Sequence, residues 1–395
     1  MILTGARIAL DAENTDRFDL SVRNGRVFFD SSDAQQPHSS QPVVDLTRFL
    51  VLPGLINAHD HLEFNLFPSL GHGAYPNAKS WAEDIYRPDA SPLKEHLAVS
   101  KRTRLIWGGL KNLLSGVTTV SHHNPYEPAV FGPSFPVNVL ERFGWAHSLD
   151  FSPDLIDRFQ ATPEEWPFIL HAAEGVDERA HSEVTRLDAL GVLSERTVLV
   201  HAIGLDQPSL NLLCQRGCSI VWCPSSNVST YGHSVASDVL RSELRVALGT
   251  DSALTAQVDL IDEIALARRT YQFSWQELYK MVTTRSACVL QLKDGQGTIR
   301  HGGVADLLVV EDRGQTPARA LEHMRPEMVV VRGNIRLVSP RLREAISHVD
   351  GSVINPVSVE GRGDWFTNVQ MSDPHEEAAR LLGPEYRLAG RRVWL

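Results

Sequence analysis

Short apolar runs recur along the middle of the chain, and most are followed by a stretch of helical periodicity. The first run, residues 49–56, is interrupted only by Pro53 and Gly54 and leads into His59-Asp60-His61. Later runs cover residues 116–120, 166–170, 197–200, 219–222 and 245–248, and they lead into His122-His123, His171, His201, Cys223 and Gly249-Thr250-Asp251 in that order. Runs of this length, bounded in this way, predict buried strands.

Helical patterns separate most of these strands, clearest over residues 81–114, 178–193 and 208–216. The alternation predicts a parallel α/β fold whose polar residues gather at the carboxyl ends of the strands. We expect a closed (β/α)8 barrel of the TIM type, because only closure brings the first and last strands together. An open doubly wound sheet would also need a glycine-rich phosphate turn, and the sequence holds no GxGxxG.

Both ends of the chain have a different pattern, with short apolar runs separated by turn residues. Residues 1–50 contain Asn24-Gly25 between two such runs, which predicts a hairpin. Residues 305–310 and 328–337 are β-rich as well. We therefore expect the two ends to join in one small β-sandwich, with the barrel inserted between them.

The chain has 395 residues, which exceeds the usual size of a single core. The predicted division has residues 1–52 and 300–395 in the composite β-sandwich, with a C-terminal tail, and residues 53–299 in the barrel. The tail after residue 340 carries no functional signal.

Charge and composition exclude some classes of function. The hydrophobic share of 43% is ordinary for a globular protein, and a net charge of -10 with a pI near 5.9 argues against nucleic-acid binding. No signal sequence and no apolar run long enough to span a bilayer occurs. We expect a cytoplasmic protein that acts on a small-molecule substrate and binds neither nucleic acid nor membrane; a homo-oligomer is left open.

The pair His59 and His61 carries the first chemical signal. Residues two apart on a strand point to the same face, so both rings can direct one nitrogen at a single point. Imidazole suits zinc, iron and other borderline metals. Taken alone the pair could equally be two polar residues where a strand enters a loop. Of the adjacent His122 and His123, at most one can point inward.

The ordered set of strand-end residues resembles the amidohydrolase superfamily. The match runs through PGLINAHDH, GVTTV, FILHAAEG, TVLVHA, CPSSNVSTYG, LGTDSALT and GQGTIRHGGVADLLVV. The order of these motifs is most similar to the mononuclear branch that holds guanine and S-adenosylhomocysteine deaminases and chlorotriazine hydrolases. The resemblance implies a barrel enzyme that hydrolyses carbon–nitrogen bonds other than peptide bonds.

The resemblance also implies a role for each matching residue. The implied metal ligands are His59, His61, His171 and Asp251. The implied catalytic residues are Glu174 as proton shuttle, His201 as hydrogen-bond partner of the reacting water or the developing oxyanion, and Asp251. The candidate substrate-binding residues are Ser226, Asn227, His123 and Trp81.

The expected cofactor is one divalent metal, zinc in the first place and iron in the second. Binuclear relatives in the superfamily use a carboxylated lysine on the fourth strand, whereas Lys101 and Lys111 precede the second predicted strand. The leading function is a deaminase that releases ammonia from an amino-substituted heterocycle or amidine. The same site could act as a chlorohydrolase or a cyclic-amide hydrolase, and a noncatalytic scaffold is the remote alternative.

Overall fold

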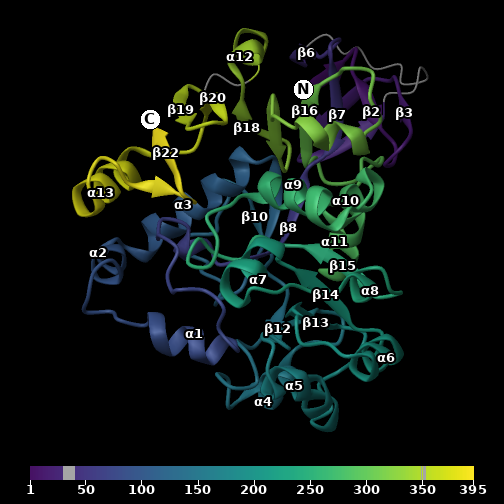
Figure 1. Cartoon of the computed structure of the whole chain (residues 1–395). Coiled ribbons are helices and arrows are strands. Elements are labelled where there is room, and N and C mark those ends of the chain that lie inside the picture. The colour runs from purple at the N-terminus through teal and green to yellow at the C-terminus, as the bar shows by residue number, and fades with distance from the viewer. Residues whose placement is uncertain (30–40, 348, 350–352) are drawn as a thin grey trace.

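The computed structural model describes residues 1–29, 41–347, 349 and 353–395. Parallel strands run through the centre of the molecule with helices around them, and a separate β unit contains the N-terminus (Figure 1). The predicted mixed α/β class is confirmed. Among the described residues, no helix has both the length and the apolarity to cross a membrane.

The central strands follow one another in chain order and form two parallel sheets. They are β8 (Leu55–Asp60), β9 (Val117–His122), β10 (Asn138–Val139), β11 (Gly144–Trp145), β12 (Phe168–Ala172), β13 (Thr197–His201), β14 (Ser219–Trp222) and β15 (Arg245–Leu248). The sheet orders are β10-β9-β8 and β11-β12-β13-β14-β15. Nearly every residue of the longer strands is buried, which explains their continuous apolar runs.

The two sheets meet where the first and last strands end. The backbone N–H groups of Thr250 and Asp251, just after β15, both donate to the carbonyl of His59 in β8, at 2.9 and 3.1 Å. The polar ends of these two strands therefore lie side by side, as the barrel prediction requires.

The helical prediction for residues 81–114 was too simple. The segment holds three helices, α1 (Ala78–Ile85), α2 (Leu93–Ala98) and α3 (Lys101–Leu114). Pro88 and Pro92 fall between the first two, and proline disfavours helical conformation in the residue before it. Helix α3 is largely buried, α2 buries only Leu93, and no residue of α1 is buried.

Further helices complete the molecule. They are η1 (Leu62–Phe64), α4 (Leu155–Ala161), α5 (Glu178–Ala189), α6 (Gln207–Arg216), α7 (Pro224–Tyr231), α8 (Ser237–Leu240), α9 (Leu260–Tyr271), α10 (Trp275–Met281), α11 (Thr284–Val289), η2 (Ala318–His323), α12 (Pro340–Ile346) and α13 (Ser372–Leu382).

The chain termini build two antiparallel-rich sheets over a second core. Their strands are β1 (Ile2–Thr4), β2 (Arg7–Ala9), β3 (Thr15–Asp16), β4 (Leu20–Arg23), β5 (Arg26–Phe29), β6 (Val43–Asp45), β7 (Phe49–Pro53), β16 (Leu307–Glu311), β17 (Met328–Val331), β18 (Asn334–Val338), β19 (Asn355–Val359), β20 (Gly363–Thr367), β21 (Arg387–Leu388) and β22 (Arg391–Trp394). Their orders are β5-β4-β1-β6 and β21-β22-β19-β20-β18-β17-β16-β7-β2-β3. Apolar side chains from both ends of the chain, including Leu3, Leu20 and Leu307, share this core.

The predicted hairpin at Asn24-Gly25 is confirmed. It joins β4 to β5 with Arg23 opposite Arg26, and both turn residues have positive φ, 50° and 74°. A two-residue turn of the I′ type requires this conformation, which asparagine and glycine adopt at low cost.

The tail after residue 340 contacts the central unit. Trp107 of α3 donates its indole N–H to the carbonyl of Pro374 at 3.2 Å, and the N–H of Ala389 donates to the carbonyl of Asn65 at 2.8 Å. Helix α13 and strand β21 contact α3, and α13 lies on the same side of the molecule as α3 in Figure 1. The tail therefore supports the segment that follows the first histidine pair.

Gly108 in α3 permits the close contact that positions this segment. A Cβ at Gly108 would lie 2.2 Å from the carbonyl oxygen of Leu62, directly after His61. We expect Gly108→Ala to lower the free energy of unfolding by about 1–3 kcal/mol, as other overpacked sites do, measured by urea denaturation. Gly132→Ala is the matched control, because a Cβ there meets nothing within 4 Å. Equal stability of the two variants would contradict the close-contact argument.

Candidate metal centre and active site

Three imidazoles and one carboxylate converge at the carboxyl ends of the central strands. Nε2 of His171 lies 3.3 Å from Nε2 of His59 and 3.4 Å from Nε2 of His61. Oδ1 of Asp251 lies 3.6 Å from His59 Nε2 and 3.7 Å from His61 Nε2. The four residues predicted as metal ligands from the motif order are therefore brought together.

The donor set fits one four-coordinate cation. In tetrahedral zinc sites with Zn–N bonds of about 2.0–2.1 Å, neighbouring ligand atoms lie about 3.3–3.4 Å apart. Burial lowers the pKa of His59, His61 and His171, so these rings are neutral near pH 7, the form that binds metal. Neutral nitrogens with converging lone pairs repel one another unless a cation lies between them.

Neighbouring groups orient two of the candidate ligands. Nδ1 of His171 lies 2.8 Å from the carbonyl of His147, and donation to it leaves the Nε2 lone pair free. Asp251 receives hydrogen bonds on Oδ2 from the hydroxyls of Ser226 at 2.6 Å and Thr255 at 3.1 Å. Burial raises the pKa of Asp251, but the neighbouring His59, His201 and His61 outweigh burial and hold this pKa well below its usual range.

Glu174 and His201 lie together beside this set. Oε1 of Glu174 is 3.4 Å from Nε2 of His201 and accepts a hydrogen bond of 2.5 Å from the hydroxyl of Tyr231. Burial raises the pKa of Glu174, while His201 and Tyr231 act in the opposite direction. A carboxyl group with a raised pKa can both take up and release a proton near neutral pH.

Ser226 and Asn227 do not line the cavity beside the ligands. Asn227 accepts a hydrogen bond on Oδ1 from Nδ1 of His201 at 2.8 Å, and Ser226 donates to Asp251. Both side chains are buried. The structure thus puts them behind catalytic candidates, where they orient His201 and Asp251, and not at the substrate surface predicted for them.

The two adjacent histidines after the second strand point to opposite sides. His123 packs behind the ligand rings, with its ring centroid 4.1 Å from that of His171, and its Nε2 donates to the carbonyl of Ala146 at 3.0 Å. His122 faces Glu63, at 3.2 Å between Nε2 and Oε2. His123 is therefore the one that faces the metal centre, but it lies outside the lining of the cavity.

A cavity of about 540 Å³ opens over the candidate ligands. Its floor includes His61, His171, Glu174, His201 and Asp251. Its outer wall includes Trp81, the remaining predicted substrate-binding residue, whose indole N–H donates to the carbonyl of Leu70 at 3.3 Å. This volume suits a small molecule.

Comparison with known proteins gives the family. Residues 161–336 match the model of the amidohydrolase family. These residues include His171, Glu174, His201 and Asp251. This part of the chain is an amidohydrolase-family domain.

Relatives of the chain have low sequence identity but long coverage. The 5-methylthioadenosine/S-adenosylhomocysteine deaminase of Pyrococcus furiosus is 24% identical over 375 residues, covering 79% of this chain and 86% of the relative. The 5′-deoxyadenosine deaminase of Methanothermobacter thermautotrophicus is also 24% identical, over 371 residues, covering 79% and 85%.

Solved structures share the fold of this chain. A zinc-bound adenosine deaminase of Xanthomonas campestris superposes with a TM-score of 0.64 at 18% identity, covering 88% of this chain and 96% of that one. The zinc complex of the atrazine chlorohydrolase of Arthrobacter aurescens gives 0.68 at 17% identity, covering 88% and 98%. At these sequence identities, the structural similarity shows a shared fold and nothing more.

Several residues at the candidate site were not predicted from the sequence. His147 lines the cavity and orients His171 through its carbonyl, and Tyr231 and Thr255 bond to Glu174 and Asp251. Tyr231 lies four residues after Asn227 in α7, so helical spacing could have indicated it, whereas Asp251 and Thr255 lie in a loop and gave no such signal. His147 follows the very short β11 and had no comparable signal.

Lys111 takes part in a buried network beneath the metal centre. Its ammonium lies 2.9 Å from Oδ2 of Asp60 and donates to Asn65 at 2.9 Å and to Thr250 at 3.2 Å. Asp60 stands between the two histidines of the first pair, and Thr250 precedes Asp251. The network ties these segments together, so Lys111 has its donors committed away from the metal centre.

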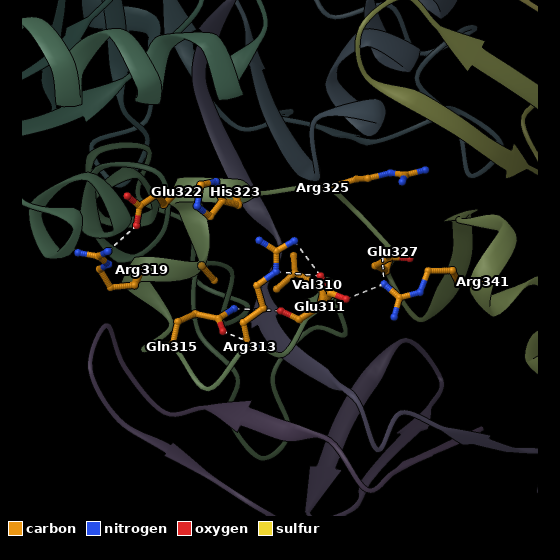
Figure 2. Close-up of a pocket in the computed structure, with 11 residues that line it drawn as sticks. Val310, Glu311, Arg313, Gln315, Arg319, Glu322, His323, Arg325, Glu327 and Arg341 are labelled. Carbon is orange, nitrogen blue, oxygen red and sulfur yellow. Dashed lines mark hydrogen bonds and ion pairs between the residues drawn. The ribbon is translucent and has the colours of Figure 1, made fainter.

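A second cavity, of about 320 Å³, lies in the β unit and carries mainly charged side chains (Figure 2). Its charges pair with one another: Arg313 and Arg341 contact Glu311, and Arg319 contacts Glu322. Metal-binding groupings among the described residues all involve His59 and its neighbours. Among the described residues, the second cavity therefore holds no group of side chains that could bind a metal ion.

Glu263 in α9 predicts a pH dependence of stability. The side chain of Glu263 is completely buried. Its Oε2 accepts hydrogen bonds from the N–H and the hydroxyl of Ser225, whereas its Oε1 has no partner among the described residues. Burial raises its pKa from 4.5 to about 8. Between pH 4.5 and about 8, the folded protein therefore binds more protons than the unfolded chain. As the pH rises through this range, Glu263 lowers the free energy of unfolding.

We expect Glu263→Gln to flatten the pH dependence of the free energy of unfolding between about pH 5 and 8, by a few kcal/mol at the upper end, since one pKa unit corresponds to about 1.4 kcal/mol. Urea denaturation at several pH values measures it. Glu178→Gln, at an exposed position of α5, is the control and keeps the wild-type slope. An unchanged slope in Glu263→Gln would show that Glu263 ionises normally.

Proposed function

We propose that this protein is a metal-dependent deaminase that releases ammonia from an amino-substituted heterocycle, with adenosine derivatives as the substrate class. The observation that carries the proposal is the convergence of His59, His61, His171 and Asp251 beside Glu174 on the floor of one cavity. Relatives named as adenosine-derivative deaminases support the choice of reaction over dechlorination.

The proposed metal is a single zinc ion held by His59, His61, His171 and Asp251. The three-nitrogen, one-oxygen set and its spacing favour zinc over larger cations that prefer oxygen ligands. A bound divalent cation supplies Lewis-acid activation of water, lowering the pKa of the water to about 7. Lys111 is held by Asp60, Asn65 and Thr250, which supports one metal and not two.

In the proposed reaction, the oxygen of water forms a bond to the ring carbon that bears the amino group, and the bond from that carbon to nitrogen then breaks. Asp251 accepts a proton from the attacking water. Glu174 takes the second proton of the water and carries it to the leaving nitrogen, which departs as ammonia, and the proton on Asp251 passes to the ring nitrogen beside the new carbonyl. His201, held by Asn227, directs Nε2 toward the same region and stabilises the oxygen as charge develops on it.

We propose the closure of the barrel and the bounds of the two structural units together with the function. The central strands form a closed (β/α)8 barrel of residues 53–299, and residues 1–52 and 300–395 form the composite β-sandwich. Hydrogen bonds from Thr250 and Asp251 to the carbonyl of His59 support closure between β15 and β8. Closure matters because it holds Asp251 beside the first histidine pair.

Purified protein tests the proposal. Elemental analysis of protein prepared without added metal is expected to give about one equivalent of zinc per chain, and the metal-loaded protein is expected to release ammonia in a screen of purines, adenosine derivatives, pterins, cytosines and triazines. Two equivalents would exclude the single-metal site. Chloride but no ammonia from halogenated triazines would assign the site to dechlorination.

A further inference from the structure

A cluster of polar side chains lies sealed from solvent beneath the proposed metal centre. Its members are at most 4% exposed, and they are Asn57, Asp60, Asn65, Lys111, Asn112 and Thr250. Burying an ammonium and a carboxylate costs free energy that only close pairing and hydrogen bonding can offset. Apolar side chains in place of such a pair are often as stable or more stable, so stability alone does not explain its presence here.

Four groups of the cluster converge on the carboxylate of Asp60. Its Oδ2 lies 2.9 Å from Nζ of Lys111 in α3. The same oxygen accepts hydrogen bonds from the side-chain amides of Asn112 at 2.8 Å and Asn57 at 3.3 Å, and Oδ1 accepts one from Asn65 at 2.8 Å. Both oxygens are therefore held, and with them the residue that separates the two histidines of the first pair.

The same ammonium also reaches the segment that carries the carboxylate ligand. Lys111 donates to the hydroxyl of Thr250 at 3.2 Å, and this hydroxyl donates to the carbonyl of Asp251 at 3.2 Å. Asn57 and Thr250 exchange two further bonds, of 2.9 and 3.2 Å. Strands β8 and β15 belong to different sheets, so Lys111 connects two segments that no common sheet aligns.

We propose that Lys111 is a positioning residue for the metal centre, which holds the first histidine pair and Asp251 at the separation that one cation requires. Oδ1 of Asp251 lies 3.6 and 3.7 Å from Nε2 of His59 and His61. Zinc bonds to nitrogen and oxygen of about 2.0–2.2 Å leave little tolerance in these separations. The inference rests on the metal site of the proposed function and not on the reaction that takes place there.

Lys111→Met tests the proposal, because it keeps a long unbranched side chain and removes the ammonium. Loss of a group that orients metal ligands typically weakens metal binding, so we expect the dissociation constant for zinc to rise by about 10–100-fold. Competition between a chromogenic chelator and the full-length, metal-free protein measures this constant. Removing a positive charge near a cation would by itself tighten zinc binding. Tighter or unchanged binding in Lys111→Met would therefore overturn the proposal.

Lys101→Met is the matched control for this substitution. Lys101 begins the same helix, and its half-exposed ammonium pairs with Glu127, which has no contact with the cluster. We expect the wild-type dissociation constant for zinc. A loss of affinity equal to that of Lys111→Met would show that any lysine replaced in α3 has the same effect, and it would overturn the proposal.

Trp107→Phe separates positioning from a general loosening of α3. It removes the indole N–H that donates to the carbonyl of Pro374 and leaves unfilled space in the core. We expect a lower midpoint of urea denaturation and an unchanged dissociation constant for zinc. If Trp107→Phe weakens zinc binding as much as Lys111→Met does, Lys111 acts through stability alone and the proposal is wrong.

Thr250→Val gives a second test that does not remove the buried charge. It keeps the branched shape and removes only the hydroxyl between Lys111 and Asp251. We expect the dissociation constant for zinc to rise by about tenfold, and an unchanged constant would overturn the proposal. Wild-type protein that binds no zinc would contradict the metal site itself, whereas tight binding that neither variant weakens would contradict only the role of Lys111.

Discussion

Replacing Glu174 with glutamine is expected to lower kcat for ammonia release by about 10² to 10⁴-fold while the metal content stays the same. The amide keeps the shape of the side chain and can still contact Tyr231 and His201, which lie 2.5 and 3.4 Å from Oε1. It cannot carry a proton from water to the leaving nitrogen. Ammonia release and elemental analysis on the same preparation measure both quantities.

Glu183→Gln is the matched control for this substitution. Glu183 lies in α5 and accepts the backbone N–H of Ala173 at 2.8 Å, next to Glu174 in the chain, and an amide oxygen can accept the same bond. We expect less than about a tenfold loss, because no proton transfer to the substrate depends on Glu183. Full activity of a metal-containing Glu174→Gln variant would mean that the proton travels by another route.

Asp251→Asn is expected to have the larger effect, with turnover reduced by more than about 10⁴-fold and the metal content well below one equivalent. Asp251 supplies Oδ1 to the candidate metal site and is the proposed proton acceptor, so one change removes two functions. The backbone should be retained, because Asp251 has a φ of 56°, a conformation that asparagine adopts readily.

Ser226→Ala provides a graded comparison with Asp251→Asn. It removes only the hydrogen bond of 2.6 Å to Oδ2 and leaves Oδ1 directed at the metal site. Metal content should persist, with a loss of activity of about tenfold, consistent with the cost of one charge-assisted hydrogen bond. Thermal unfolding of both variants tests whether they are folded. A folded Asp251→Asn variant with full metal and full activity would remove Asp251 from the mechanism.

The sequence by itself determined the class of the fold and the strand-end positions of the candidate residues, because both depend on local periodicity, while the resemblance to a known family implied which of these residues are metal ligands. A buried parallel strand must be apolar along its whole length, so polar residues such as His171 and His201 stand out where the strand ends. The spacing of His59 and His61 follows from the two-residue repeat of a strand. The hairpin at Asn24-Gly25 could also be predicted from a short stretch of sequence, since its turn needs positive φ at two successive residues.

Only the tertiary structure decided which of these residues meet and what surrounds them. Ser226 and Asn227 matched a motif, yet their side chains lie behind Asp251 and His201, because α7 presents them to these two residues and not to the cavity. No periodicity indicates that the apolar face of α1 would line the cavity, since an amphipathic helix that packs on a core has the same pattern. Burial and long-range contacts depend on how distant segments come together, and a local pattern does not contain that information.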